Sequence, residues 1–445
     1  MLTDKDACPV KPAVAPRKAV TILFLVVFID LLGFGIMIPL VPFYVERLGV
    51  GPELITAILA LYSLVQFAVT PFWGHVSDRV GRRPVLLLCM AGHIGAYVML
   101  AFADTLAMLI LSRVLGGLTA GNLAASYAYI TDITPPQERS RHLGKISAAF
   151  GLGFVMGPAL GGLLAGTGDI AEANFMRPAL AAAGLSAVAL VGILLFLPES
   201  HRPVRSGLPG APKVSGPGLR EGIGLILRRR TIALMIMLCL IVITFAAVRE
   251  SIFSLWANHQ FGYNAATIGL FFSFNGVIIT LIQFFGMGPL TTRFGEHALL
   301  MTGMLMYTLS WIGLIVAQGM VGLFLAMAAS GVGTALFGTS LQSLLSRRAG
   351  PQERGAVMGV YQSTSSLGRF CGQTMSGTLY GQVGPNAPFA IGALAMIPAF
   401  VIAVMIGRRL RAERPSQQTP GEQAAAPLDA NTHAAPMAGQ RAGRH

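Results

Sequence analysis

The sequence predicts an all-α integral membrane protein with twelve transmembrane helices in two pseudo-symmetric six-helix bundles. The chain has 445 residues, of which 54% are hydrophobic and 11% are charged, whereas an ordinary soluble domain carries about 25% charged residues. Apolar stretches of roughly 20 residues, the length that crosses a bilayer as a helix, recur along most of the chain. Short motifs also recur at a fixed offset across its middle. Helices follow because backbone groups in lipid must be satisfied within their own segment.

The apolar stretches give the predicted helices in order, six before and six after a segment rich in Pro and Gly. That composition is typical of a flexible linker. The expected spans are 19–44, 54–74, 84–103, 106–131, 142–166, 175–197, 231–257, 265–288, 297–317, 319–345, 355–382 and 386–407. The expected organisation is an N-terminal tail 1–18, a first half 19–197, a linker 198–230, a second half 231–407 and a disordered C-terminal tail 408–445.

The net charge of +13 follows membrane topology and does not indicate a nucleic-acid partner. Most of the 32 Lys and Arg residues fall in the tails, the linker and the loops after the even-numbered spans, whereas Arg47 and Arg177 fall in loops on the opposite side. The positive-inside rule therefore places both termini in the cytoplasm of a bacterial inner-membrane protein. Residues 1–18 carry no cleavage-type segment, so we expect the first span to be retained. The four cysteines show no paired spacing, and neither a metal site nor a cofactor is expected.

An internal repeat relates the two predicted halves. Gly74, Arg79 and Gly81 recur at an offset of 214, and the tetrapeptide Pro-Gln-Glu-Arg at 136–139 recurs at 351–354. The glycines of the fifth span recur in the eleventh with an offset of 215, as Gly144/Gly359, Gly153/Gly368, Gly157/Gly372 and Gly162/Gly377. A parallel repeat of six spans predicts a binding site between two halves that rock against each other.

The loop after the second span combines glycines with one acid and several arginines. It reads Gly-His-Val-Ser-Asp-Arg-Val-Gly-Arg-Arg from Gly74 to Arg83. Glycine permits a tight turn. Asp78 can accept a hydrogen bond from the N–H groups of a helix N-terminus, or it can form an ion pair with an arginine of the other half. The loop resembles the cytoplasmic signature of the major facilitator superfamily, which implies a latch that holds the cytoplasmic side shut in one conformation. The latch residues would be Gly74, Asp78, Arg79, Gly81 and Arg82.

A purely topological role for the arginines of this loop is the alternative. Thr292 replaces the acid in the second copy, so a symmetric second latch is not expected.

The fifth span carries glycines at regular spacing around one proline. Glycines four residues apart share a face and let another helix approach, and proline permits a bend. The spacing resembles the motif of the drug:proton antiporter branch of the superfamily, with ordinary close packing as the alternative. The motif residues are Gly144, Gly153, Gly157, Pro158, Gly161 and Gly162.

Two acidic residues, Asp30 and Glu250, fall inside the predicted spans. Asp30 lies twelve residues past Lys18, which puts it about 18 Å deep. A charge there costs at least about 2.5 to 3.5 kcal/mol, so each acid is a functional candidate. An arginine such as Arg113 lowers the pKa of a nearby carboxyl while desolvation raises it, so we expect Asp30, Arg113 and Glu250 to handle protons. Structural ion pairs are the alternative.

Two further segments resemble bacterial tetracycline-efflux proteins. They are Asp-Leu-Leu-Gly-Phe-Gly-Ile-Met-Ile-Pro at 30–39 and Arg-Val-Leu-Gly-Gly at 113–117. The resemblance implies a transporter that exports a small amphipathic or drug-like compound in exchange for protons.

Other polar and aromatic residues of the spans are candidates for the cavity. Arg249 and Glu250 are consecutive, about 100° apart on a helix, and are not expected to face each other. We expect His93 to be packed or lipid-facing, and for Arg369 a substrate role and a tether to a carbonyl or lipid headgroup both remain open. The candidate cavity residues are Arg249, Phe245, Phe271, Phe274, Asn275 and Gln342.

Together these patterns predict a proton-coupled secondary transporter, not an enzyme, which acts as a monomer. Its expected partners are the lipid bilayer, protons and a small-molecule substrate. A proton-coupled importer or metabolite exporter of the same fold is one alternative, because fold does not fix substrate. A membrane sensor or assembly factor that transports nothing is another. An ATP-driven pump is disfavoured because the sequence has no Gly-rich phosphate loop.

Overall fold

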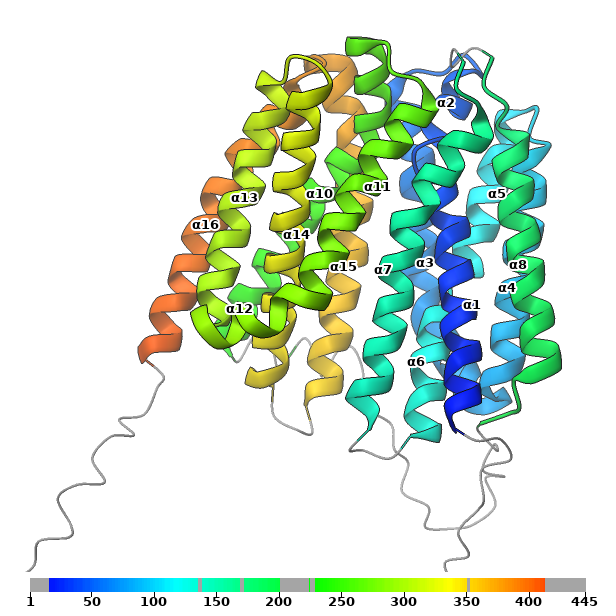
Figure 1. The fold of residues 1–445 in the computed structure, drawn as a ribbon, viewed down its shortest axis with the longest axis horizontal. Helices are drawn as coiled ribbons and strands as arrows, with labels where there is room; N and C mark the ends of the chain where they lie inside the picture. Colours follow the sequence, from blue (N-terminus) through cyan, green and yellow to red (C-terminus); the bar gives the residue numbers. More distant parts are fainter. Residues whose placement is uncertain are drawn as a thin grey trace, which may run out of the picture.

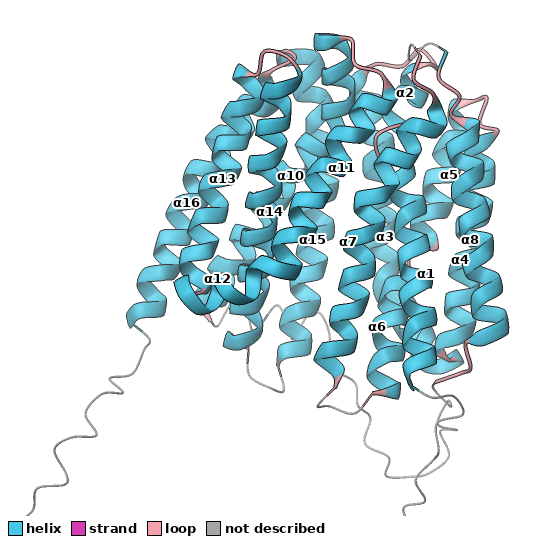
Figure 2. Cartoon of the chain, viewed as in Figure 1, coloured by secondary structure: helices cyan, strands magenta, loops and turns pink. Residues whose placement is uncertain are grey.

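The computed structural model of the protein describes residues 16–134, 138–168, 172–200, 224, 229–349 and 353–412. Throughout this part of the chain the regular elements are helices (Figure 2), which confirms the all-α prediction. Most of the predicted N-terminal tail, linker and C-terminal tail lies outside the described residues. Residues 408–412, which were expected to belong to a disordered tail, are helical instead.

The N-terminal half contains seven long helices or helix segments and one short helix in its described part. Its fourth predicted span is divided into α5 and α6 by a break at 119–121. The helices are α1 (Pro16–Met37), α2 (Val41–Glu46), α3 (Pro52–Val80), α4 (Arg82–Ala101), α5 (Leu106–Leu118), α6 (Asn122–Ile133), α7 (Arg139–Ala165) and α8 (Met176–Phe196).

The C-terminal half repeats this order with two π-helical turns. Such turns widen the helix locally and are often found at functional sites. The elements are α10 (Arg230–Phe261), α11 (Ala265–Leu281), the π-turn η2 (Ile282–Gly286), α12 (Met287–Phe294), α13 (Glu296–Val316), α14 (Met320–Arg348), α15 (Arg354–Thr378), the π-turn η3 (Leu379–Val383) and α16 (Ala387–Ala412).

The two sets of helices form two bundles side by side, with α7 and α3 of the first packed against α11 and α15 of the second (Figure 1). The starts of α1 and α10, and those of α7 and α15, keep the offsets of the sequence repeat. Gly81 and Gly295 occupy equivalent turns, with φ of 110° and 78° that favour glycine. We call the end where α1 begins and α16 ends the linker end, and the opposite end, where α2 lies, the far end.

In the described part of the chain, ten helical segments are long and apolar enough to cross a membrane, and α7 and α15 are not among them. These two helices have 27 and 25 residues, so their length suffices for a crossing. Helix α7 packs on α1 and α11, and α15 packs on α10 and α3. Because each helix faces protein on two sides, it tolerates glycines and polar side chains that a lipid-facing helix would not.

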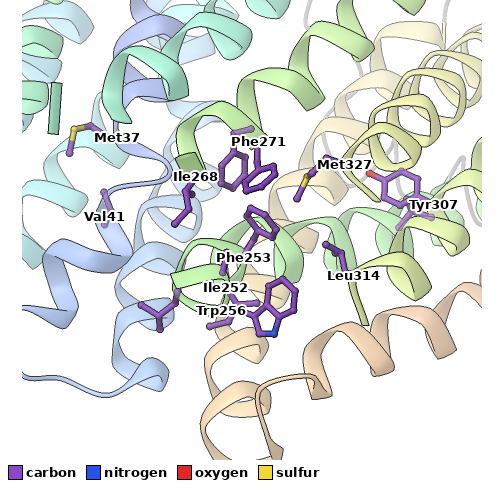
Figure 3. Close-up of a cluster of buried hydrophobic side chains, with 14 of the residues drawn as sticks. Met37, Val41, Ile252, Phe253, Trp256, Ile268, Phe271, Tyr307, Leu314 and Met327 are labelled. Carbon is purple, nitrogen blue, oxygen red and sulfur yellow. The ribbon is translucent and has the colours of Figure 1, made fainter. Parts of the chain in front are cut away.

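The largest cluster of buried apolar side chains runs through both halves. It extends from Met37 and Val41 into the second half, where Ile252, Phe253 and Ile268 belong to the same cluster (Figure 3). Met37 ends α1 and Val41 begins α2, so this part of the cluster lies toward the far end.

Hydrogen bonds also join the halves in the far portions of their helices. They link Ser63 Oγ to Gln373 Oε1 (2.7 Å), the amide of Ala159 to Ser273 Oγ (2.9 Å), the amide of Gly377 to Thr56 Oγ1 (3.1 Å) and His259 Nε2 to Glu46 Oε1 (2.8 Å). Packing and hydrogen bonding therefore hold the bundles together at the far end.

Candidate functional site

A cavity of about 180 Å³ lies between the two halves. All three residues predicted to handle protons, Asp30, Arg113 and Glu250, line its wall. The N-terminal half also contributes Tyr62, His93 and Tyr97, and the C-terminal half contributes Gln362, Arg369 and Gln373. The repeat predicted a site between the halves, and the cavity occupies that position.

Asp30 is paired with His93. Asp30 Oδ1 lies 2.8 Å from His93 Nδ1, and the two residues are 8% and 6% exposed. Both α1 and α4 begin at the linker end, and counting from their first residues puts Asp30 and His93 about 21 and 17 Å along them. His93 is packed, as one of the two expectations had it, but its ring faces a buried carboxylate, and this pairing was not predicted. The matching depth on two helices that run in the same direction was the signal that could have identified the pair.

The Asp30 carboxylate and the His93 imidazole are in hydrogen-bond contact through one ring nitrogen. His93 Nε2 is buried and has no hydrogen-bond partner among the described residues. The pair thus has one ring nitrogen committed to Asp30 and the other unused. This arrangement can carry a proton while keeping the carboxylate oriented. The described residues contain no group of three or more His, Cys, Asp or Glu side chains that could hold a metal ion.

Arg113 lies on α5 and faces the same cavity without touching Asp30. Its Nε is buried and unpaired, and within the described ranges the guanidinium forms no hydrogen bond or ion pair. Tyr62 and Tyr97 line the same cavity as Asp30 and Arg113. Any influence of Arg113 on Asp30 therefore acts across the cavity and not through an ion pair.

Arg249 and Glu250 point in different directions, as their positions on the helix predict. Glu250 lines the cavity. Arg249 is 3% exposed, and its Nη1 donates to Met327 Sδ at 3.6 Å inside the second half, where Figure 3 shows Met327 and Tyr307. Only the glutamate is placed to meet a ligand in the cavity.

The candidate cavity residues of the second half lie elsewhere. Phe271 is fully buried against Phe253 and Phe324, and the Asn275 amide donates to the Met327 carbonyl at 2.8 Å. Gln342 is exposed. An apolar helix has no sequence signal that fixes which face turns toward a cavity, and packing of α11 against α7 and α14 decides it here. The residues absent from the cavity wall are Arg249, Phe245, Phe271, Phe274, Asn275 and Gln342.

The predicted latch forms a compact turn at the linker end. Gly74 lies within α3, Arg79 is exposed near its end, and the positive φ of Gly81 allows α4 to start at once. Arg82 bonds to Asp78 Oδ1 at 2.5 Å and to Asp132 Oδ2 at 3.0 Å. The described partner of Asp78 is thus an arginine of its own half, not one of the other half as the sequence allowed.

Glu199, which sequence reasoning did not select, binds the start of α4. Its carboxylate accepts from the amides of Arg82 (2.8 Å) and Arg83 (3.1 Å). These amides belong to a helix N-terminus, where a carboxylate is stabilised by unpaired N–H groups and the helix dipole. The segment that follows α8 is thereby tied to the latch turn.

Helix α7 is in close contact with helices of both halves. A Cβ at Gly157 would lie 2.7 Å from Gly35 Cα of α1, and one at Gly153 would lie 2.9 Å from the Leu32 amide. On its other side, a Cβ at Gly162 would lie 2.5 Å from the Ala265 carbonyl of α11. Pro158 and Gly161 continue the two contacts, while Gly144 lies near the helix start. The glycine motif therefore serves an interface between halves as well as packing within one.

Comparison with known proteins places this geometry among membrane transporters. The sequence matches the profile of the Major Facilitator Superfamily over residues 23–256 and again over 250–439. It is 30% identical to the class C tetracycline resistance protein of Escherichia coli, covering 82% of this chain and 90% of that protein. It is 25% identical to the quinolone resistance protein NorA of Staphylococcus aureus strain MSSA476, and the match covers 90% of this chain and 99% of that protein.

Solved structures share the fold. The human organic anion transporter MFSD10 (TETRAN) superposes with a TM-score of 0.66 at 24% identity, covering 88% of this chain and all of that one. The nucleoside transporter NupG superposes with a TM-score of 0.70 at 16% identity, and the match covers 88% of this chain and 99% of that one.

Proposed function

Because the chain belongs to the major facilitator superfamily, we propose that it is a proton-coupled antiporter that exports a small amphipathic or drug-like compound by alternating access. The observation that carries the proposal is the buried Asp30–His93 pair in a cavity between two halves. The relatives named for resistance to tetracycline and quinolone support export as the direction.

The coupling step follows from the position of Asp30. An antiporter needs a group that is either protonated or in contact with bound substrate, but never both at once. Asp30 lines the confined cavity that a substrate would occupy, so a substrate and a proton would compete for one site. Glu250 faces the same space from the other half and is the second carboxyl able to respond.

The alternating step follows from the contacts between halves. Hydrogen bonds join the bundles toward the far end, while the described partner of Asp78 at the linker end lies in its own half. We assign the linker end to the cytoplasm from the positive-inside pattern. The conformation described here is then closed toward the outside, and closing the cytoplasmic side brings the latch turn against the second half.

Proton exchange in everted membrane vesicles tests the proposal. Vesicles are acidified by respiration, and a compound against which the chain protects a pump-deficient host is added. Antiport predicts that the compound releases part of the pH gradient in vesicles with the chain and not in vesicles without it. An unchanged gradient for every compound that the chain confers resistance to would contradict proton antiport.

A reporter fusion tests the orientation. Gly210 lies outside the described residues, in the predicted linker, and a fusion there should report the cytoplasm. A matched fusion at Gly168, in the loop between α7 and α8, should report the opposite side. Periplasmic labelling at Gly210 would reverse the assignment of the two ends.

A further inference from the structure

Two arginines from opposite halves face the cavity without partners. Arg113 of α5 is 8% exposed, and Arg369 of α15 is partly buried. Neither forms a hydrogen bond or an ion pair within the part of the chain that the structure describes. A guanidinium held in a membrane-embedded cavity without a counter-ion is costly, which points to a ligand that completes it.

Tyr62 of α3 lines the same cavity as the two arginines. The adjacent Ser63 is hydrogen-bonded to Gln373, which lies one helical turn beyond Arg369 on the same face of α15. This contact joins α3 to α15 within the cavity wall, to which Tyr62 and Arg369 also contribute.

The acids of the cavity leave these arginines free. Asp30 is committed to His93 at 2.8 Å, and among the described residues Glu250 forms no ion pair with either arginine. A planar guanidinium binds an oxyanion through two parallel hydrogen bonds, and two guanidinium groups around one cavity favour a negative group between them.

We infer that Arg369 and Arg113 together bind an oxyanion group, a carboxylate or sulfonate, of an aromatic substrate. This rests on the proposed function, whose substrate class it narrows. The aromatic part of the substrate would contact Phe34 and Tyr62, whose ring centroids lie 5.6 Å apart in the cavity wall.

A matched pair of fluorescent probes tests the inference. 8-Anilinonaphthalene-1-sulfonate and N-phenyl-1-naphthylamine share their rings, and only the first carries an anionic group. Binding is measured with the full chain in lipid nanodiscs at one pH, after subtraction of empty nanodiscs. The variants are Arg369→Gln, Arg369→Lys and, as a control, Arg177→Gln, which removes an exposed charge near the far end.

We expect the native chain to bind the sulfonate at least tenfold more tightly than the neutral probe. Arg369→Gln should remove this preference and leave the Kd of the neutral probe within twofold, which also shows that the variant is folded. Arg369→Lys should keep part of the preference, and Arg177→Gln all of it.

Equal binding of the two probes, no binding of the sulfonate, or a preference that survives Arg369→Gln would overturn the inference. Because no proton gradient is present, the result does not depend on antiport. Sulfonate binding that needs Arg369, without release of a pH gradient in vesicles, would support the anion site and contradict the proposed function.

Discussion

The two halves carry equivalent ion pairs with reversed charges at the linker end. In the first half Arg82, at the start of α4, bonds to Asp132 of α6 at 3.0 Å. In the second half Glu296, at the start of α13, bonds to Arg347 of α14 at 3.1 Å. The offsets between equivalent partners are 214 and 215, those of the sequence repeat. The repeat therefore retains the contact between two helices while its polarity differs.

The halves differ more strongly in the middle of the membrane. By the offset of 214, the residues equivalent to Asp30, His93 and Arg113 are Thr244, Tyr307 and Met327. The second half thus replaces an acid, a histidine and an arginine with an alcohol, a phenol and a thioether. A symmetric scaffold carries asymmetric chemistry, and the proposed proton step is confined to one half plus Glu250.

The largest expected effect breaks this asymmetry at Asp30. Asp30→Asn mimics the neutral carboxyl at nearly the same size and can still hydrogen-bond to His93. We expect uphill efflux driven by a pH gradient to fall to the level of vesicles without the protein, while substrate binding or downhill exchange remains. Thr244→Ser at the equivalent position should retain efflux.

If Asp30→Asn still accumulates substrate against its gradient, Glu250→Gln becomes the deciding variant. Should that variant also be active, proton antiport through these carboxyls is wrong.

A smaller effect is expected at the latch turn. Asp78→Asn removes the charge that bonds to Arg82, and we expect most transport to be lost while the amount of protein in the membrane stays normal. Thr292→Val changes the equivalent position, where the described hydrogen bond of the hydroxyl stays within its own helix, to the Pro289 carbonyl at 2.9 Å. Thr292→Val should transport normally. Full transport by Asp78→Asn would show that the turn sets membrane topology and does not act as a latch.

Helix packing is where the halves should behave alike. A Cβ at Gly157 would meet the backbone of α1, and a Cβ at the equivalent Gly372 would meet the Thr244 carbonyl of α10. Each alanine substitution should cost about 1 to 3 kcal/mol of stability, because a backbone neighbour cannot rotate away. Thermal unfolding in detergent measures this. Gly192→Ala, which meets no atom within 4 Å, is the control, and an undiminished melting temperature for Gly157→Ala would contradict the close packing.

The smallest contrast concerns the reversed ion pairs. The side chain of Arg82 is 9% exposed and bonds to two carboxylates, whereas that of Arg347 is 72% exposed. Arg82→Gln should lower stability by about 1 to 2 kcal/mol, because the buried guanidinium makes charged hydrogen bonds to two carboxylates. Arg347→Gln should cost less, about 0.5 kcal/mol, because the arginine is exposed to solvent and Glu296 keeps its hydrogen bond from Ser343. Equal shifts in melting temperature would show that burial does not distinguish the two pairs.

Much of the architecture was predictable from the sequence because its signals are local. A helix that crosses lipid needs an unbroken apolar stretch, and the repeat fixed the pairing of the two halves through glycines and a tetrapeptide. The same signals were weakest for α7 and α15. Their contacts with both halves remove the need for an apolar surface all round, and the repeat identified them where hydropathy did not.

The sequence by itself determined the depth of the functional residues, because depth follows from the rise of about 1.5 Å per residue along a helix. It thereby put Asp30 near mid-membrane. Only the tertiary structure decided which side chains face one another, because the rotation of each helix about its axis is set by packing against its neighbours. That rotation turned His93 onto Asp30, brought Arg369 into the cavity and buried Arg249 and Phe271 elsewhere.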